Sequence, residues 1–251
     1  MALVEREVHG GITVIRMNRP EKLNAMNGAM LRELIGAFTD FQQNDDEKIA
    51  VLIGNGRAFC SGEDLVEAAE RGTPGLDPTL PFDPFWGQAI EKPLIACVNG
   101  WAMGGGFIHA YYCDLRIASR NAVFEISEAR HWLLGAYQFG FTDTLPWSIA
   151  TELALGFRMS AERAYDVGFV NRLVETPDDL LPAALEMCDH LLSLPPASLK
   201  NTLEISRRLR PTIPKDVSER GEVLKSSGAL DDVMESRRAF AEKRKPVFKG
   251  F

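Results

Sequence analysis

The chain has 251 residues, of which 45% are hydrophobic and 25% charged, the mixture of one globular domain or of one domain with a small appendage. This composition excludes disordered, collagen-like and coiled-coil proteins, and the apolar stretches are too short for a membrane span. The formal net charge of −7 disfavours nonspecific binding to nucleic acid or to anionic membranes. Residues 1–10 are charged where a signal peptide would be apolar, and the four cysteines lie far apart. We therefore expect a cytoplasmic protein with free thiols and no metal site.

The first half of the chain alternates short apolar runs with helical patterns. We expect strands at 3–8, 12–17, 49–53, 94–98, 115–118 and 123–126. We expect helices that begin at Asn27 and Gly104 and a further helix at 84–92. The run 94–98 is continuously apolar, as in a strand that is buried on both faces.

The rest of the chain is almost wholly helical, apart from a last strand expected at 169–174. Two adjacent prolines at 195 and 196 mark the clearest boundary, so we divide the chain into a core, residues 1–195, and a C-terminal helical region, residues 196–251. Strands that alternate with helices and are followed by a helical tail indicate an α/β core with an α-helical appendage. The tail has too little apolar surface for a core of its own, so we expect it to pack on this subunit or on another one. Its helices are expected at about 197–209, 215–227 and 230–244.

Two junctions between a loop and a helix, Ala58–Leu65 and Asn99–Gly106, carry the strongest chemical signal. At such a junction the first N–H groups of the helix have no helical partner, and the helix dipole adds positive charge. Three consecutive glycines at 104–106 would let a ligand approach the backbone closely. Two N–H groups that converge on one oxygen form an oxyanion hole, although either junction alone could be a simple turn and cap. The glycines lack the G-x-G-x-x-G spacing, which argues against a nicotinamide enzyme.

Seven short blocks, spread over nearly the whole chain, form a pattern that is far more specific than a single glycine motif. The blocks are Asn18–Pro20, Leu23–Met26, Ala58–Leu65, Val98–Gly106, Cys113–Asp114, Phe124–Glu128 and Ala239–Pro246. In this order they resemble the crotonase superfamily, which is the enoyl-CoA hydratase/isomerase family. The resemblance implies an α/β fold, a crotonase-like spiral of ββα units with a C-terminal α-helical trimerisation region. It also implies a homotrimer or a hexamer made of two trimers.

The resemblance further implies an acyl-CoA substrate, no metal, and no cofactor beyond the coenzyme A of the substrate. It places the two N–H groups of the oxyanion hole at Glu63 and Gly105. The carboxylates of Glu63 and Asp64 are themselves expected to be helix-start and capping groups. The matching contacts to coenzyme A are Lys22, Leu23, Ala25, Phe240 and Lys243. From the residues alone, the two lysines could equally be solvated charges and Phe240 could pack in a trimer.

The acid/base residue that the resemblance implies is Glu128. Hydratases of this family hold one water between two glutamates, and the position of the first is Ile108 here, which cannot transfer a proton. We therefore expect Glu128 to be the single general acid/base, with a pKa raised by burial near an apolar acyl pocket. From the residues alone, Glu128 could also be a surface glutamate that starts a helix after Ser127. His131 follows three residues later and is a possible second acid/base if this stretch is helical. His109, one residue after Ile108, is expected to face elsewhere and to pack in the core or against a partner.

The expected function is that of an enoyl-CoA hydratase/isomerase-type enzyme, which stabilises a thioester enolate and moves a proton in double-bond isomerisation or hydration. An acyl-CoA hydrolase or a carbon–carbon lyase of the family would use the same oxyanion hole and stays an alternative. A catalytically silent homologue that binds acyl-CoA or RNA is another, although the acidic charge opposes RNA binding. The acyl group of the substrate is not predicted. Relatives are glycine-rich at 132–141, but this chain has bulky residues there, which could reshape the acyl pocket together with Phe82, Phe85 and Trp86.

Overall fold

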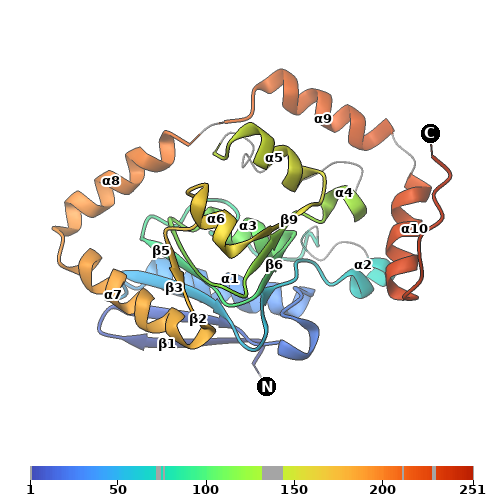
Figure 1. The fold of residues 1–251 in the computed structure, drawn as a ribbon. Coiled ribbons are helices and arrows are strands. Elements are labelled where there is room, and N and C mark those ends of the chain that lie inside the picture. Colours follow the sequence, from blue (N-terminus) through green and yellow to red (C-terminus); the bar gives the residue numbers. More distant parts are fainter. Residues whose placement is uncertain are drawn as a thin grey trace.

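The computed structural model describes residues 2–71, 75, 77–131, 144–210, 212–227 and 230–250. These residues form two β-sheets, and helices pack against them. The last three helices run as an arc around this core, and the C-terminus ends beside α10 (Figure 1).

The larger sheet has six strands in the spatial order β1-β2-β3-β5-β7-β10. β1 pairs with β2 in the antiparallel sense, and the other neighbours are parallel. Its strands are β1 Val4–His9, β2 Ile12–Met17, β3 Ile49–Gly54, β5 Leu94–Val98, β7 Leu115–Ser119 and β10 Arg172–Val174. The last strand is shorter than expected because the N–H groups of Phe169 and Val170 both bond to the carbonyl of Ala164 in the preceding turn.

Both faces of the larger sheet are covered, which explains its continuously apolar strands. Leu52 of β3 packs in a cluster with residues of α1 (Gly28–Gln43), and its neighbour Val51 packs on the other face with residues of α7 (Leu180–Leu192). The Asn27 side chain caps α1 by accepting a hydrogen bond from the Met30 N–H at 2.9 Å.

The smaller sheet places the two glycine junctions next to each other. Its strands, in spatial order, are β4 Ala58–Cys60, β6 Trp101–Met103, β8 Val123–Glu125 and β9 Arg158–Ser160. β4, β6 and β9 were not expected, because three residues are too few to show a strand period. β6 leads into α3 (Gly105–Tyr112), and β8 leads into α4 (Glu128–His131). Since β4, β6 and β8 are parallel, their carboxyl ends meet at one edge of the sheet.

The expected helix at 84–92 is wrong. The Asp83 carboxylate accepts hydrogen bonds from the N–H groups of Phe85, at 2.8 Å, and Trp86, at 3.1 Å, and so forms a local turn. Gln88 has a positive φ of 51°, which ends that turn instead of extending it into a helix.

The C-terminal helices are α8 Pro196–Arg208, α9 Lys215–Ser227 and α10 Leu230–Ala241, close to the expected ranges. Arg207 ties α8 to the core through two hydrogen bonds to the Asp114 carboxylate, of 2.8 and 2.7 Å. α10 packs against α2 (Leu65–Arg71) and α4, where the Ser236 hydroxyl donates to the carbonyl of Arg130 at 2.6 Å. The remaining elements are η1 Pro20–Lys22, α5 Trp147–Ala154, α6 Ala161–Asp166 and η5 Pro177–Asp179. Among the described residues, no helix has the length and hydrophobicity to cross a membrane.

Candidate active site

The two glycine junctions are in direct contact at Gly62 and Gly104. Gly62 has a φ of 90°, and a Cβ there would lie 2.8 Å from the carbonyl oxygen of Met103 and 3.2 Å from the nitrogen of Gly105. Gly104 has a φ of 52° and is the N-cap of α3. Both positions therefore require glycine, for conformation and for space. Their close approach brings the backbone around Glu63 next to the first turn of α3.

The backbone of Glu63 is held by a parallel bridge to Met26. Met26 donates its N–H to Gly62 at 2.8 Å, and its carbonyl accepts the N–H of Asp64 at 3.0 Å. Successive N–H groups of an extended segment point to opposite sides, so the N–H of Glu63 points away from Met26. Gly105 is the first residue of α3, where the N–H group is not used by the helix. The two N–H groups expected to form the oxyanion hole thus belong to adjoining segments.

The Glu128 carboxyl lies against this pair of segments. A Cβ on Gly104 would be 3.3 Å from Oε1 of Glu128, so glycine leaves the space that the carboxyl occupies. Oε2 of Glu128 is buried and finds no hydrogen-bond partner among the described residues. Burial raises the pKa of Glu128 to about 7, and the negative charges of Glu63 and Glu125 act in the same direction. At this pKa the carboxyl can both give and take a proton near neutral pH.

Glu125 forms ion pairs with Arg130 and Arg158, and we call these three residues the ion-pair floor. The Glu125 side chain is fully buried, with Nε of Arg158 at 2.8 Å and Nη1 of Arg130 at 3.2 Å. The backbone oxygen of Glu125 accepts the N–H of Gly104 at 2.9 Å. The ion-pair floor therefore joins β8, β9, α4 and the glycine junction. The carboxylate of Glu125 thus has a structural role.

Ile108 and His109 are both part of the core. Ile108 is completely buried among apolar residues, so position 108 supplies no proton-transfer group. Nδ1 of His109 lies 2.7 Å from the Gly105 carbonyl, and its ring stacks on Phe85 with 4.8 Å between centroids. Burial lowers the pKa of His109, which keeps the ring neutral. The side chain of His131 lies outside the described residues, as does the bulky stretch 132–141.

Asp64 is a helix cap, as expected, and it also has a partner that the sequence did not indicate. Its Oδ1 accepts hydrogen bonds from the N–H groups of Val66, at 3.1 Å, and Glu67, at 3.3 Å. Its Oδ2 accepts one from Arg19 at 2.6 Å, and Arg19 also donates to the Ala25 carbonyl at 3.0 Å. These bonds connect the segment before Met26 to the segment that carries Glu63. Glu63 was expected at the start of this helix, but α2 begins only at Leu65.

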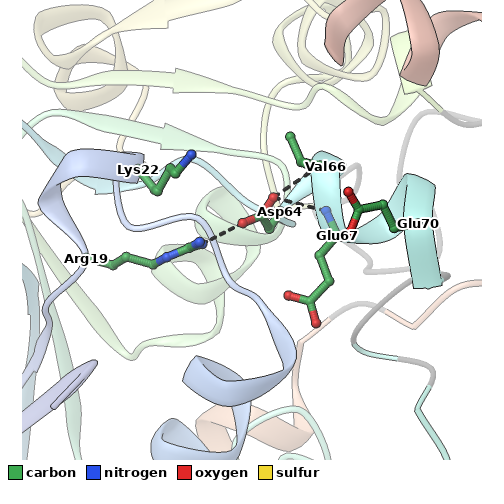
Figure 2. A pocket seen from close by; sticks show the side chains of 6 residues that line it. All are labelled: Arg19, Lys22, Asp64, Val66, Glu67 and Glu70. Atoms are coloured by element: carbon green, nitrogen blue, oxygen red, sulfur yellow. Dashed lines mark hydrogen bonds and ion pairs between the residues drawn. The ribbon is translucent and has the colours of Figure 1, made fainter. Parts of the chain in front are cut away.

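A pocket of about 250 Å³ adjoins this segment at the protein surface. Arg19 and Lys22 project from one side, Glu67 and Glu70 lie on α2 at the other, and Asp64 stands between them (Figure 2). Leu23 follows Lys22 and accepts the N–H of Ser61 at 3.0 Å. Three of the expected coenzyme A contacts, Lys22, Leu23 and Ala25, are thus in the segment that runs alongside Glu63.

The other two expected contacts, Phe240 and Lys243, are at the end of α10. The Phe240 side chain is 55% exposed, and the N–H of Lys243 bonds to the Phe240 carbonyl at 3.1 Å as the helix ends. Both residues lie outside the lining of the Lys22 pocket. α10 nevertheless packs against α2, which forms one wall of that pocket (Figure 1).

Neither metal-binding nor thiol chemistry is indicated by the described residues. Within the described ranges, no three His, Cys, Asp or Glu side chains gather in a group that could hold a metal ion. The four cysteines are free and buried, and burial raises the pKa of Cys60, the one nearest the site, to about 12. A thiol of this kind is inert as a nucleophile.

Two backbone N–H groups beside a buried carboxyl are typical of enzymes that stabilise an oxyanion while a proton moves. Residues 7–250 match the enoyl-CoA hydratase/isomerase family. Carnitinyl-CoA dehydratase from Salmonella typhi is 35% identical over 260 residues, which cover 96% of both chains. The structure of carnitinyl-CoA hydratase from Mycobacterium avium has a TM-score of 0.82 at 30% identity over 99% of both chains. That of an enoyl-CoA hydratase from Mycobacterium tuberculosis has a TM-score of 0.76 at 32% identity over the whole of both.

The chain belongs to the enoyl-CoA hydratase/isomerase family of the crotonase superfamily, and it is an enzyme that acts on acyl-CoA. The expected family and the expected crotonase-like α/β fold are both confirmed. The roles of the individual site residues stay predictions.

Proposed function

We propose that the protein catalyses the reversible addition of water to 2-enoyl-CoA thioesters, with Glu128 as a general acid/base. The observation that carries this proposal is the position of the Glu128 carboxyl, which lies against Gly104 with one oxygen buried and unpartnered among the described residues. The names of the similar proteins support it, because dehydration of a 3-hydroxyacyl-CoA is the reverse of hydration.

In the proposed reaction the thioester oxygen accepts hydrogen bonds from the N–H groups of Glu63 and Gly105. Negative charge grows on this oxygen as an enolate forms, so the two preorganised donors bind the transition state more strongly than the substrate. Loss of one such donor typically costs about 3–4 kcal/mol. Glu128 then gives a proton to the α carbon in hydration, or takes that proton in dehydration.

Double-bond isomerisation is a second candidate, and the observation that favours it is the buried, apolar Ile108. One carboxyl is enough to carry one proton between the α and γ carbons of an enolised thioester. Isomerisation needs no bound water, whereas hydration does.

The deciding experiment follows the absorbance of the conjugated thioester with three substrates: a 2-enoyl-CoA, a 3-enoyl-CoA and carnitinyl-CoA. Hydration removes the absorbance of the 2-enoyl-CoA, isomerisation of the 3-enoyl-CoA creates it, and dehydration of carnitinyl-CoA creates it as well. We expect the first of these without release of free thiol. Free coenzyme A would instead identify a hydrolase, a shorter acyl-CoA a lyase, and coenzyme A binding without turnover a silent homologue.

We also propose that coenzyme A binds along Lys22, Leu23 and Ala25, with Phe240 and Lys243 contributing from α10 of the same subunit or of a neighbouring one. Lys22 is exposed in a pocket beside the Glu63 segment, where an ammonium group can meet a phosphate. Substitution of Lys22 by alanine should therefore raise KM and leave kcat nearly unchanged. An unchanged KM would remove Lys22 from the binding site.

The region 196–251 is proposed as the oligomerisation region, with a second and a third copy of this chain as its partners. The helices that form the arc, together with α5, expose several large apolar side chains, which one subunit alone leaves in water. They are Trp147, Leu155, Ile205, Leu209 and Val217. Light scattering should give the mass of a trimer or a hexamer, and a monomeric mass at micromolar concentration would contradict the proposal.

A further inference from the structure

The side chain of Glu63 has a position that its backbone role does not explain. Glu63 precedes α2, is held by the bridge to Met26, and has its Oε1 atom buried. A Cβ on Gly62, immediately before it, would lie 3.6 Å from the Cα of Gly104, and a Cβ on Gly104 would lie 3.3 Å from Oε1 of Glu128. A carboxylate that starts from this backbone and ends in the protein interior thus lies in the same region as Glu128.

The electrostatics agree with this geometry. The charge of Glu63 is close enough to Glu128 to raise the pKa of the latter, in addition to the larger effect of burial. A like charge disfavours the ionised form of a neighbouring carboxyl only over short distances or in a poorly solvated environment. The site therefore contains two interacting carboxyls, although Ile108 occupies the position of the first family glutamate.

We propose that the Glu63 carboxylate is the second acid/base group of this site, and that it takes the proton of the water that attacks the β carbon. The inference rests on the proposed hydratase function. It assigns to one residue two separate tasks: its N–H group binds the thioester oxygen, and its side chain activates water. The missing carboxyl at position 108 is thus replaced from a different element of the fold.

Each bond that forms in this step is matched by a bond that breaks, and no oxidant or reductant is needed. The water oxygen forms a bond to the β carbon, and its O–H bond breaks with the proton going to Glu63. The electron pair of the enolate then takes a proton from Glu128 at the α carbon. After one turnover Glu63 is protonated and Glu128 is ionised, so a proton must return from Glu63 to Glu128. The proximity of the two carboxyls provides a path for this return, directly or through one water.

Other charged groups near Glu63 and Glu128 influence the pH profile, but they are the same in the wild type and in a Glu63→Gln variant. The charge of Glu125 on β8 acts on Glu128, and Arg130 of α4 and Arg158 of β9 pair with Glu125. α10 packs against α4 and carries the buried Arg237. None of these groups is changed when Glu63 is replaced by glutamine.

The test uses Glu63→Gln, which keeps the N–H group and the shape of the side chain but removes its basicity. Hydration of a 2-enoyl-CoA should fall about 10²- to 10³-fold, in the range that a general base contributes. Exchange of the α hydrogens of butyryl-CoA with D₂O needs only the oxyanion hole and Glu128, so it should stay within about threefold of wild type. A variant with a damaged oxyanion hole would lose both reactions.

The pH profile provides a readout that a purely structural role would not change. In the wild type, hydration should require an ionised Glu63 and a protonated Glu128, which gives a bell-shaped curve. In Glu63→Gln the acidic limb should disappear, and the basic limb should move to lower pH because the repulsion on Glu128 is relieved. Formate should restore part of the hydration in Glu63→Ala, because it can occupy the vacated space as a base.

Glu186→Gln is the matched control, since Glu186 is an exposed carboxylate on α7 that pairs with Arg172 and lies outside the site. The inference is overturned if Glu63→Gln hydrates within about threefold of wild type, or if it loses α-hydrogen exchange in parallel with hydration and formate rescues neither. Failure of the proposed function is a separate result, because wild type itself would then not hydrate any enoyl-CoA.

Discussion

Glu125 and Glu128 are three residues apart, at the end of β8 and the start of α4, and their carboxyls have opposite surroundings. The Glu125 carboxylate is enclosed by the ion-pair floor, where Arg130 and Arg158 neutralise it. No described residue forms an ion pair with Glu128; Gly104 lies against it, and the acidic groups Glu63 and Glu125 act on it. Charge compensation fixes one carboxylate in the structure, and its absence leaves the other available for proton transfer.

The largest effect is expected on turnover, when Glu128, the carboxyl without an ion-pair partner among the described residues, is changed. Glu128→Gln should lower kcat about 10³-fold, or about 4 kcal/mol in the activation barrier, because an amide cannot transfer a proton at this pH. Affinity for coenzyme A should be nearly unchanged, as measured by calorimetry. Glu186→Gln is again the control, and a Glu128→Gln variant with wild-type turnover would remove Glu128 from the mechanism.

The same carboxyl should make stability depend on pH. The pKa of Glu128 is raised in the folded protein from 4.5 to about 7, so the folded state holds its proton more tightly than the unfolded state. This contribution is fully present below pH 4.5 and is lost as the pH rises towards 7, which amounts to about 3 kcal/mol. Urea unfolding at pH 4.5 and pH 8 should show that Glu128→Gln stabilises the protein at the higher pH relative to the lower. If the variant and the wild type differed in unfolding free energy by the same amount at both pH values, Glu128 would be solvated.

Removal of the charge of Glu125, which is paired with two arginines, should lower the free energy of unfolding more than the rate of the reaction. Glu125→Gln leaves Arg130 and Arg158 without their carboxylate, but both arginines are about half exposed and can be solvated. We therefore expect a loss of about 2 kcal/mol in the free energy of unfolding, below the range for fully buried pairs. The pKa of Glu128 should fall, because one of the charges that raise it is gone. A basic limb of the pH–rate profile that stays in place would contradict this coupling.

The smallest effect is expected from one arginine of the floor. Arg158→Ala leaves Glu125 with Arg130 at 3.2 Å and also removes the contact of Arg158 with the face of Trp101, at 4.9 Å. A loss of about 1 kcal/mol in the free energy of unfolding should result. A much larger loss would show that Arg130 does not compensate Glu125 by itself. The measurement is urea unfolding at one pH, with Arg172→Ala, another partly exposed arginine with one carboxylate partner, as the control.

Local patterns in the sequence were sufficient for most of the larger sheet and its first helix. The continuous run 94–98 predicted a doubly buried strand, and Asn27 marked the start of α1, because both signals depend on near neighbours alone. The strands β4, β6 and β9 were missed since each has three residues and gains its stability from pairing with distant segments. The helix expected at 84–92 failed because the Asp83 side chain stabilises a competing turn.

At the site, residue types and spacing indicated the glycine junctions, since each is visible in a short stretch of chain. The role of Glu128 and the loss of a carboxyl at Ile108 were implied by the resemblance to the family. The surroundings of each carboxyl were not visible in any such stretch. Glu63 and Glu128 are far apart in the chain, and they interact because parallel strands of the smaller sheet end at one edge while Gly62 and Gly104 leave no side chain between them. The pairing of Glu125 with Arg158 likewise depends on β9, which joins that sheet from a later part of the chain. Electrostatic energy depends on distance and burial in three dimensions, so the fold had to be known before these glutamates could be assigned different tasks.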